Sequence, residues 1–299
     1  MASIKDLKKR IGSVKNTQQT TKAMKMVSAA KLRRAQDAII SNRPYAKAVG
    51  NLIEQMLGQP DADFESPLLD REGVESKDGT KKVLVLVVTS DRGLCAGFNS
   101  NLIRATQRWV RDNKSNYASI TLAYLGKRGF DFFKTKNYTQ GTYFQEAGGK
   151  VTFQKAKDVS TQLVQSYLDG QYDEVKIVFN EFKNAAAQLI RFEDFLPLRQ
   201  NTAAKEGDDQ ASSGMVLVKP SPNAVLKALL EKHFNIQIFR VMLDSQAGEH
   251  GARMSAMENA TKNAGEMIKR LTLVYNKQRQ AGITKELLEI ISGSESQKQ

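Results

Sequence analysis

The sequence predicts an α/β protein with two parts: a long antiparallel coiled coil of its N- and C-terminal helices, and a small doubly wound, mostly parallel α/β domain. All six prolines lie from residue 44 to residue 222, so two long proline-free segments flank a middle section. The flanking segments repeat apolar residues at helical spacing, whereas the middle alternates strand-like and helical patterns. The predicted limits are 1–57 for the N-terminal coiled-coil helix, 58–80 for a linker, 81–200 for the central Rossmann-like domain, 201–222 for a second linker and 223–299 for the C-terminal coiled-coil helix.

Alternating steps of three and four residues select a heptad seam in the first segment. Its members are Ile4, Leu7, Ile11, Val14, Gln18, Thr21, Lys25, Ser28, Leu32, Ala35 and Ile39. The seam is apolar at both ends and polar in its middle. Because local propensity alone does not stabilise such a helix, it needs a partner. The helix can continue through Pro44 with a kink.

The last segment supplies a plausible partner helix. Two stripes at helical spacing are Leu226, Leu230, Phe234, Ile238 and Val241, and Met267, Leu271, Val274, Gln278 and Ala281. Small residues between the stripes, from Ser245 to Ala260, allow two helix backbones to approach closely. Antiparallel pairing is the simplest arrangement for two long helices joined through one middle domain. The alternative is that each helix packs separately on the middle domain.

The middle section begins with residues 81–90, a nearly continuous run of apolar residues typical of a strand buried on both faces. Further strands are predicted at 118–126, 174–182 and 188–198. Helices are predicted at 98–113, 127–135 and 156–170. This alternation indicates a small, mostly parallel sheet.

The turn after the first strand contains Gly93 and Gly97. Their spacing fits neither the dinucleotide-binding fingerprint nor a P-loop. We therefore predict a tight turn in which Asn99 or Ser100 caps the next helix, rather than a phosphate site. Cys95 has no histidine near it in sequence, so we expect a small buried residue and no reactive thiol.

Composition excludes several classes of function. One cysteine and two histidines leave no disulfide framework and no cysteine-based zinc cluster. No apolar stretch is long enough to span a bilayer, so no direct membrane insertion is expected. We find no arrangement of side chains suited to catalysis and none suited to a metal or cofactor.

The net charge of +13 is concentrated in residues 1–43, which hold 11 basic and 2 acidic residues. The basic residues spread around the helix instead of forming one face, and no aromatic residue precedes Tyr45. A DNA-reading helix would present one basic face. The distribution favours contact with acidic protein surfaces, and a coiled-coil scaffold with a basic nucleic-acid-binding arm remains the alternative.

Several motifs together resemble one family, the gamma subunits of F-type ATP synthases, over essentially the whole chain. The N-terminal motifs are Asn16-Thr17-Gln18, Thr21 to Val27, and Arg43-Pro44-Tyr45. The central motif is Asp91-Arg92-Gly93-Leu94-Cys95 with Gly97 and Asn99. The C-terminal motifs are Ala252-Arg253-Met254, Ala256-Met257, Val274 to Lys277, Arg279-Gln280, Ile283 to Leu287, and Glu289-Ile290 with Gly293. Two positions depart from the family. Lys25 stands where the family commonly has an acidic residue, and Ser294 follows Gly293 where the family usually has Gly-Ala.

The resemblance implies a non-catalytic central rotor shaft of the ATP synthase, without a cofactor. Such a shaft couples ion flow through the membrane c-ring to ATP synthesis or hydrolysis at the beta subunits by rotation. The implied partners are three alpha and three beta subunits, the epsilon subunit and the c-ring, with no nucleic acid. The implied location is peripheral, on the cytoplasmic face of a bacterial inner membrane. The lack of a transit extension and of a cysteine pair favours a bacterial protein over an organellar one.

The resemblance also implies which residues contact the stator. Coupling contacts carried over from the family are Met24, Lys25, Arg279, Gln280, Thr284, Glu286 and Glu289. An apolar shaft tip is expected at Ile283, Leu287, Leu288, Ile290 and Ile291. We expect Lys25 to lie near an acidic beta-subunit segment. We interpret the polar middle of the seam as a surface that adheres weakly to the surrounding ring.

Overall fold

The computed structural model describes residues 3–57, 66–69, 81–145, 151–185, 187–198 and 221–296. Contacts divide the chain into two compact units, residues 1–29 with 253–299, and residues 30–252. Two long helices, α1 (Ile4–Leu57) and α5 (Pro222–Ser296), contribute a segment to each unit, and α1 continues through Pro44 as predicted. The expected linkers fall outside the described residues, apart from 66–69 and the start of α5.

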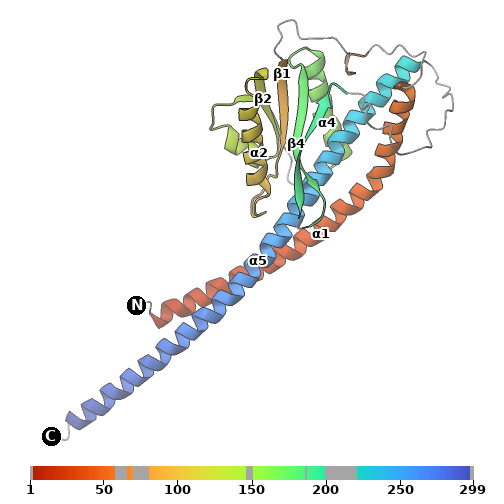
Figure 1. Cartoon of the computed structure of the whole chain (residues 1–299). Coiled ribbons are helices and arrows are strands. Elements are labelled where there is room, and N and C mark those ends of the chain that lie inside the picture. The colour runs from red at the N-terminus through yellow and green to blue at the C-terminus, as the bar shows by residue number, and fades with distance from the viewer. Residues whose placement is uncertain are drawn as a thin grey trace. The chain divides into compact units, whose positions relative to one another are not determined.

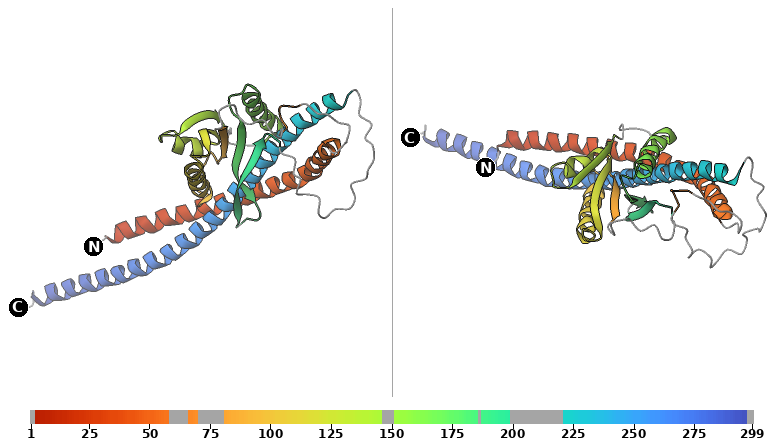
Figure 2. Two further views of the ribbon diagram at one scale, coloured as in Figure 1. Left: turned by 45° about the horizontal axis from the view of Figure 1, so that its top comes forward. Right: turned by 90° about the horizontal axis from the view of Figure 1, so that it is seen from above.

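In the first unit, α1 and α5 run antiparallel, as Figure 1 and Figure 2 show. A Cβ atom added at Gly282 would lie 3.6 Å from Cδ1 of Ile4. Further along the pair, the side-chain amide of Gln18 lies 3.4 Å from the carbonyl oxygen of Thr261. These contacts confirm the predicted antiparallel coiled coil. Because Gly282 lies opposite the first turn of α1, the last turns of α5 extend beyond the N-terminal end of α1.

The second unit contains a five-stranded sheet in the order β3-β2-β1-β4-β5. Its strands are β1 (Lys81–Val88), β2 (Tyr117–Leu125), β3 (Thr139–Phe144), β4 (Glu174–Phe182) and β5 (Gln188–Leu196). Only the β4–β5 pair is antiparallel, which confirms a mostly parallel sheet. Strand β3 was not predicted from sequence, because its residues TQGTYF lack an apolar run and lie at an edge of the sheet.

Helices cover both faces of this sheet (Figure 1). Helices α2 (Phe98–Asp112) and α3 (Lys127–Phe133) pack on one face, where Val85 joins Leu102 and Phe133 in a fully buried cluster. Helix α4 (Phe153–Leu168) packs on the other face. The α5 segment of this unit lies beside it, since Phe239 of α5 contacts Phe153 of α4 with ring centroids 5.6 Å apart.

The α5 segment 234–252 is buried along most of its length. It packs against β5 and α4 at Phe234 and Phe239, and its last turns reach the carboxyl ends of the central strands. In a doubly wound sheet, this crevice is where ligands bind. Here Ala252 packs with Cys95 and Phe98 from the β1–α2 connection. Gly251 faces the backbone of Ala185, in the β4–β5 turn. A helix of the same chain therefore occupies the position that a dinucleotide would take.

Candidate functional site

The seam between the helices of the first unit follows the predicted heptads in α1. Leu7 is buried, Ile11 and Val14 are partly buried, and Thr21 is only 9% exposed. The Thr21 and Thr261 hydroxyl oxygens lie 2.8 Å apart. The polar middle of the seam therefore faces α5 within the chain. The interpretation of this middle as a weakly adhering outer surface was wrong, because burial takes these side chains off the outside of the pair.

The second apolar stripe predicted on α5 is displaced from the actual seam. Met267, Val274 and Ala281 are exposed, and Leu271 and Gln278 are partly buried. The α5 residues that face α1 include Thr261 and Gly265. The α5 residues that are buried or partly buried in this unit combine small and polar residues with apolar ones such as Met257 and Ile268, whereas Met267 and Val274 lie exposed. This mixed composition made the seam difficult to predict from the sequence. Met267 and Val274 instead line a groove with Arg10 and Val14 of α1.

Lys25 forms an ion pair within the chain. Its Nζ atom lies 2.7 Å from Oε1 of Glu258 on α5, and both side chains remain more than one-third exposed. The sequence suggested an acidic partner on another subunit, and the structure adds an intrachain partner that the sequence did not indicate. An exposed pair of this kind contributes at most about 1 kcal/mol to stability, so Lys25 can exchange partners at low cost.

The other expected coupling residues do not form one cluster in the chain. Met24 is partly buried on α1, whereas Arg279, Gln280, Thr284, Glu286 and Glu289 are exposed on α5. The Thr284 hydroxyl donates to the carbonyl oxygen of Gln280 at 3.0 Å. Glu289 lies 3.5 Å from Lys285, one helical turn away. These contacts are local to α5, so the side chains are available to another surface.

The end of α5 exposes a set of large apolar side chains. Each member is at least half exposed: Ile283, Leu287, Leu288, Ile290 and Ile291. The helix continues here past the point where Ile4 meets Gly282. Exposed apolar side chains grouped in this way mark a surface that another molecule covers. The apolar tip is the strongest feature of the molecule that suggests a partner.

The turn after β1 is closed by its own hydrogen bonds. The amide groups of Lys127, Arg128 and Gly129 at the start of α3 donate to Asp91, Ser90 and Thr89, respectively. Amide groups at a helix N-terminus are the groups that bind phosphate in α/β folds. Protein acceptors in the turn already occupy these amides, so the start of α3 is tied to the turn after β1.

Within the same turn, the predicted capping of α2 was wrong. The N-cap residue is Gly97, and it has no side-chain cap. Asn99 instead accepts a hydrogen bond from the Ser90 amide at 3.0 Å and so fixes the turn. Cys95 is buried, as expected. Leu94 and Ala96 have positive φ angles of 62° and 49°, which the sequence did not indicate because both residue types avoid this region.

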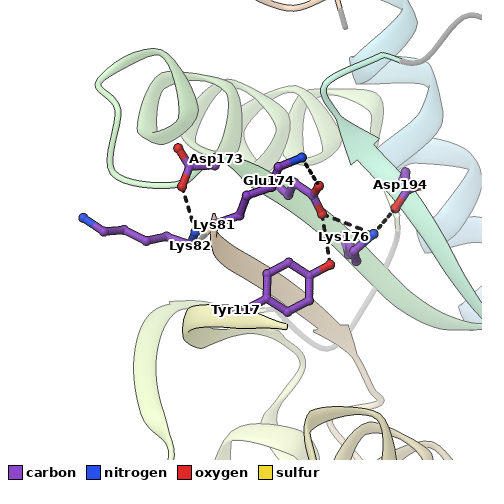
Figure 3. Close-up of polar contacts among 7 residues, drawn as sticks. All are labelled: Lys81, Lys82, Tyr117, Asp173, Glu174, Lys176 and Asp194. Atoms are coloured by element: carbon purple, nitrogen blue, oxygen red, sulfur yellow. Dashed lines mark hydrogen bonds and ion pairs between the residues drawn. The ribbon is translucent and has the colours of Figure 1, made fainter. Parts of the chain in front are cut away.

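Sequence reasoning missed a buried carboxylate at the amino edge of the sheet (Figure 3). Glu174 is 5% exposed. Its carboxylate lies 3.2 Å from Lys81 Nζ and 3.5 Å from Lys176 Nζ, and it accepts a hydrogen bond from the Tyr117 hydroxyl at 3.1 Å. Lys176 also pairs with Asp194. The cluster therefore joins β1, β2, β4 and β5.

Two irregularities in strand pairing flank this cluster. The β1–β2 register shifts between Lys81 and Lys82, and the β4–β5 register shifts between Val175 and Lys176. Irregularities of this kind redirect side chains. Burial alone would raise the pKa of Glu174, but Lys176, Lys81 and the Tyr117 hydroxyl outweigh it and leave the pKa lowered. Only the fold brings Lys81 and Tyr117 to Glu174, since 93 and 57 positions of sequence separate them from it.

Asp244 is a second buried carboxylate, on the α5 segment of the second unit. Burial raises its pKa to about 6, and the nearby carboxylates of Glu181 and Glu193 act in the same direction. Arg240 and Arg43 oppose this shift. Arg240 is itself paired with Glu193 of β5. The Asp244 carboxyl therefore keeps its proton to a higher pH than an ordinary aspartate does.

The described part of the chain shows no cluster of three or more side chains that could hold a metal ion. None of its helices combines the length and the apolar character that a bilayer-crossing helix needs. The candidate site is the surface of the helix pair of the first unit that carries the expected coupling residues and the exposed apolar tip.

Comparison with known proteins gives consistent matches. The family model described as ATP synthase matches residues 3–296. The chain is 46% identical over 301 residues to the ATP synthase gamma chain of Bdellovibrio bacteriovorus, covering 100% of both chains. It is 46% identical over 296 residues to the ATP synthase gamma chain of Geotalea uraniireducens, covering 99% of each.

Solved structures share the fold. A chain from the Euglena gracilis mitochondrial ATP synthase, in a structure of OSCP, F1 and the c-ring, matches with a TM-score of 0.65 at 20% identity, over 98% of this chain and 94% of that chain. A chain of the Tetrahymena thermophila mitochondrial ATP synthase central stalk and c-ring matches with a TM-score of 0.60 at 24% identity, over 81% of this chain and 99% of that chain.

Proposed function

The chain belongs to the family of ATP synthase gamma chains, and on that premise we propose that it is the central rotor shaft of an F-type ATP synthase. It couples ion flow through a membrane c-ring to ATP synthesis or hydrolysis at the beta subunits by rotation. It has no active site of its own. Family membership supports this reading and leaves the nucleic-acid-binding scaffold without support.

The observation that carries the proposal is the free end of α5 in the first unit. This end extends past α1 and exposes the apolar tip from Ile283 to Ile291. A shaft inserted into a ring of subunits requires a single helix end with an apolar surface that the ring covers. An apolar collar of alpha and beta subunits would bury the tip and favour insertion by the hydrophobic effect.

The mechanism follows from contact between an asymmetric shaft and three equivalent subunits. Helices α1 and α5 present different side chains on different sides, so each beta subunit meets a different surface at any one time. A contact that favours one beta conformation shifts the population of that subunit toward it. Turning the shaft moves each surface to the next subunit, and the three sites change conformation in sequence.

The proposed partners are three alpha and three beta subunits around the helix pair, with the epsilon subunit and the c-ring at the α/β domain. The proposed location is peripheral, on the cytoplasmic face of a bacterial inner membrane. The proposed stator contacts are the residues expected from the sequence: Met24, Lys25, Arg279, Gln280, Thr284, Glu286 and Glu289. Except for the partly buried Met24 and Lys25, these side chains are exposed, which supports a role in contacts with other subunits.

Reconstitution tests the proposal. The tagged full chain is mixed with purified alpha and beta subunits and recovered by its tag, in parallel with a chain truncated after Gly282. The full chain should recover a ring of both subunits, and the truncated chain should recover less because the apolar tip is missing. The full chain alone should hydrolyse no ATP. Failure to recover alpha and beta subunits, or turnover by the purified chain, would overturn the proposal.

A further inference from the structure

The geometry points to a register lock inside the helix pair of the first unit. We infer that Gln18, Thr21 and Thr261 fix α1 and α5 in one axial alignment. This inference concerns the helix pair itself and does not depend on rotation. It replaces the interpretation of the polar seam as an outer surface.

The lock consists of two hydrogen bonds across the seam. The hydroxyl oxygens of Thr21 and Thr261 lie 2.8 Å apart, and the Gln18 amide donates to the Thr261 carbonyl oxygen at 3.4 Å. The Thr261 hydroxyl also lies 2.7 Å from the carbonyl oxygen of Met257 in its own helix. The Thr21 hydroxyl lies 3.0 Å from the carbonyl oxygen of Gln18 in its own helix. Since each hydroxyl donates only one hydrogen bond, the hydroxyl that donates across the seam gives up the bond within its own helix, and the other hydroxyl keeps its own.

Packing alone specifies the alignment weakly at this level. On the C-terminal side of Thr261, the seam residues of α5 are Ala264 and Gly265, which are too small to act as knobs in holes of the facing helix, whereas Met257 on the other side is large and buried. The apolar residues of α1 recur at heptad spacing, at Leu7 and Val14 among others. A slide of seven residues would therefore still place apolar positions of α1 on the same face.

The polar contacts do not survive such a slide. Displacement by one heptad places Thr21 opposite Ile268 or Met254, neither of which offers a polar side-chain partner to its hydroxyl. Lys25 would then lose Glu258, with which it pairs at 2.7 Å. Each hydrogen bond made only in the native register changes the ratio of registers by about two- to tenfold. Buried polar residues are known to specify alignment in coiled coils in this way.

Disulfide trapping measures the register directly. The pair Ile4→Cys with Gly282→Cys reports the native alignment, because a Cβ atom at position 282 lies 3.6 Å from Cδ1 of Ile4. Pairs of Ile4→Cys with Tyr275→Cys or with Glu289→Cys report slides by one heptad in either direction. The natural Cys95 is buried, and the chain without added cysteines serves as the background control. Trapping is done on the full chain under native conditions.

The lock is removed with Gln18→Leu, Thr21→Val and Thr261→Val. The matched control is Thr17→Val with Thr20→Val, since these exposed threonines donate only to carbonyl oxygens of α1. The yield of the slid pairs relative to the native pair should rise at least about fivefold without the lock, and the control should not change. Unchanged relative yields without the lock, or an equal rise in the control, would overturn the inference.

A variant in which α1 and α5 no longer pair must be distinguished from a variant in which they pair in a shifted register. Helix content of each variant is therefore measured by circular dichroism. If the triple variant loses helix, the same trapping is done on Thr21→Val alone, which should shift the relative yield by about twofold or more. The conservative Thr21→Ser keeps the hydroxyl and should retain the native register. A shifted register in the Thr21→Ser variant would contradict the role of the Thr21 hydroxyl in the lock.

Discussion

A Cβ atom placed on Gly251 of α5 would lie 3.1 Å from both the Cα atom and the carbonyl oxygen of Ala185 in the β4–β5 turn. This approach of backbone to backbone seats α5 at the carboxyl end of the sheet. Gly248, one turn earlier, faces Phe98 and Gln188 at similar distances. The glycines therefore explain how a long helix fits where a ligand would otherwise lie.

Gly251→Ala should destabilise the protein by about 1–3 kcal/mol, because the neighbouring atoms belong to backbone and cannot move aside easily. Gly12→Ala is the matched control, since nothing lies within 4 Å of a Cβ atom there. It should stabilise its helix by about 0.5–1 kcal/mol. Denaturant unfolding followed by circular dichroism measures both, and equal effects at the two positions would contradict the close seating of α5.

Asp244 should make stability depend on pH. Its pKa is about 6 in the folded chain against an ordinary value of 3.8, so the folded state holds the proton over a range where the unfolded state has lost it. Stability from this group is present at low pH and declines as the pH rises through 6. The decline should total about 2–3 kcal/mol between pH 4 and pH 7.

Asp244→Asn should remove this decline and leave the chain more stable at pH 8. Asp112→Asn is the control, because Asp112 is exposed on α2. The measurement is the free energy of unfolding across the pH range, taken as the difference between each variant and the natural chain. A difference for Asp244→Asn that does not vary with pH would show that Asp244 does not titrate in this range.

Removal of the Glu174 carboxylate should weaken the amino edge of the sheet. Glu174→Ala leaves Lys176 partly buried beside Asp194 alone, and we expect a loss of about 2–4 kcal/mol. Trp109, the only tryptophan, lies 5.9 Å from Tyr117 between ring centroids, so its fluorescence reports unfolding here. Glu231→Ala, in an exposed pair with Lys157, should cost less than about 1 kcal/mol.

Exchanging the charges of Lys25 and Glu258 separates two roles of Lys25. Lys25→Glu should lower the efficiency of proton-driven ATP synthesis in the assembled complex, because it removes a cation next to the proposed stator. If only the internal pair matters, Lys25→Glu with Glu258→Lys should restore coupling. We expect no restoration. Full restoration by the exchanged pair would assign Lys25 to the helix pair alone.

The sequence predicted the features that depend on long runs of residues. The apolar run from Val83 to Val88 predicted a fully buried central strand, and the structure confirms it. The heptad spacing from Leu7 to Ile39 predicted the buried seam of α1, which is also confirmed. Strand β3 was missed because an edge strand needs no apolar run. The second α5 stripe was misplaced, because Met267 and Val274 are exposed whereas Thr261 and Gly265 face α1.

Features that depend on tertiary contact were outside the reach of sequence reasoning. Glu174 and Lys81 lie 3.2 Å apart although 93 residues separate them, and Lys25 and Glu258 are separated by 233 residues. The exposed apolar residues from Ile283 to Ile291 were predicted through the family resemblance, and the structure adds that they lie past the end of α1.

Rotation of the chain within an assembled ring tests the central claim most directly. The alpha and beta subunits are fixed to a surface, and a probe is attached through Lys114→Cys at an exposed position of the α/β domain. With ATP supplied, the probe should turn in one direction, in three equal steps per turn. A probe that stays fixed or only fluctuates while the ring hydrolyses ATP would contradict it.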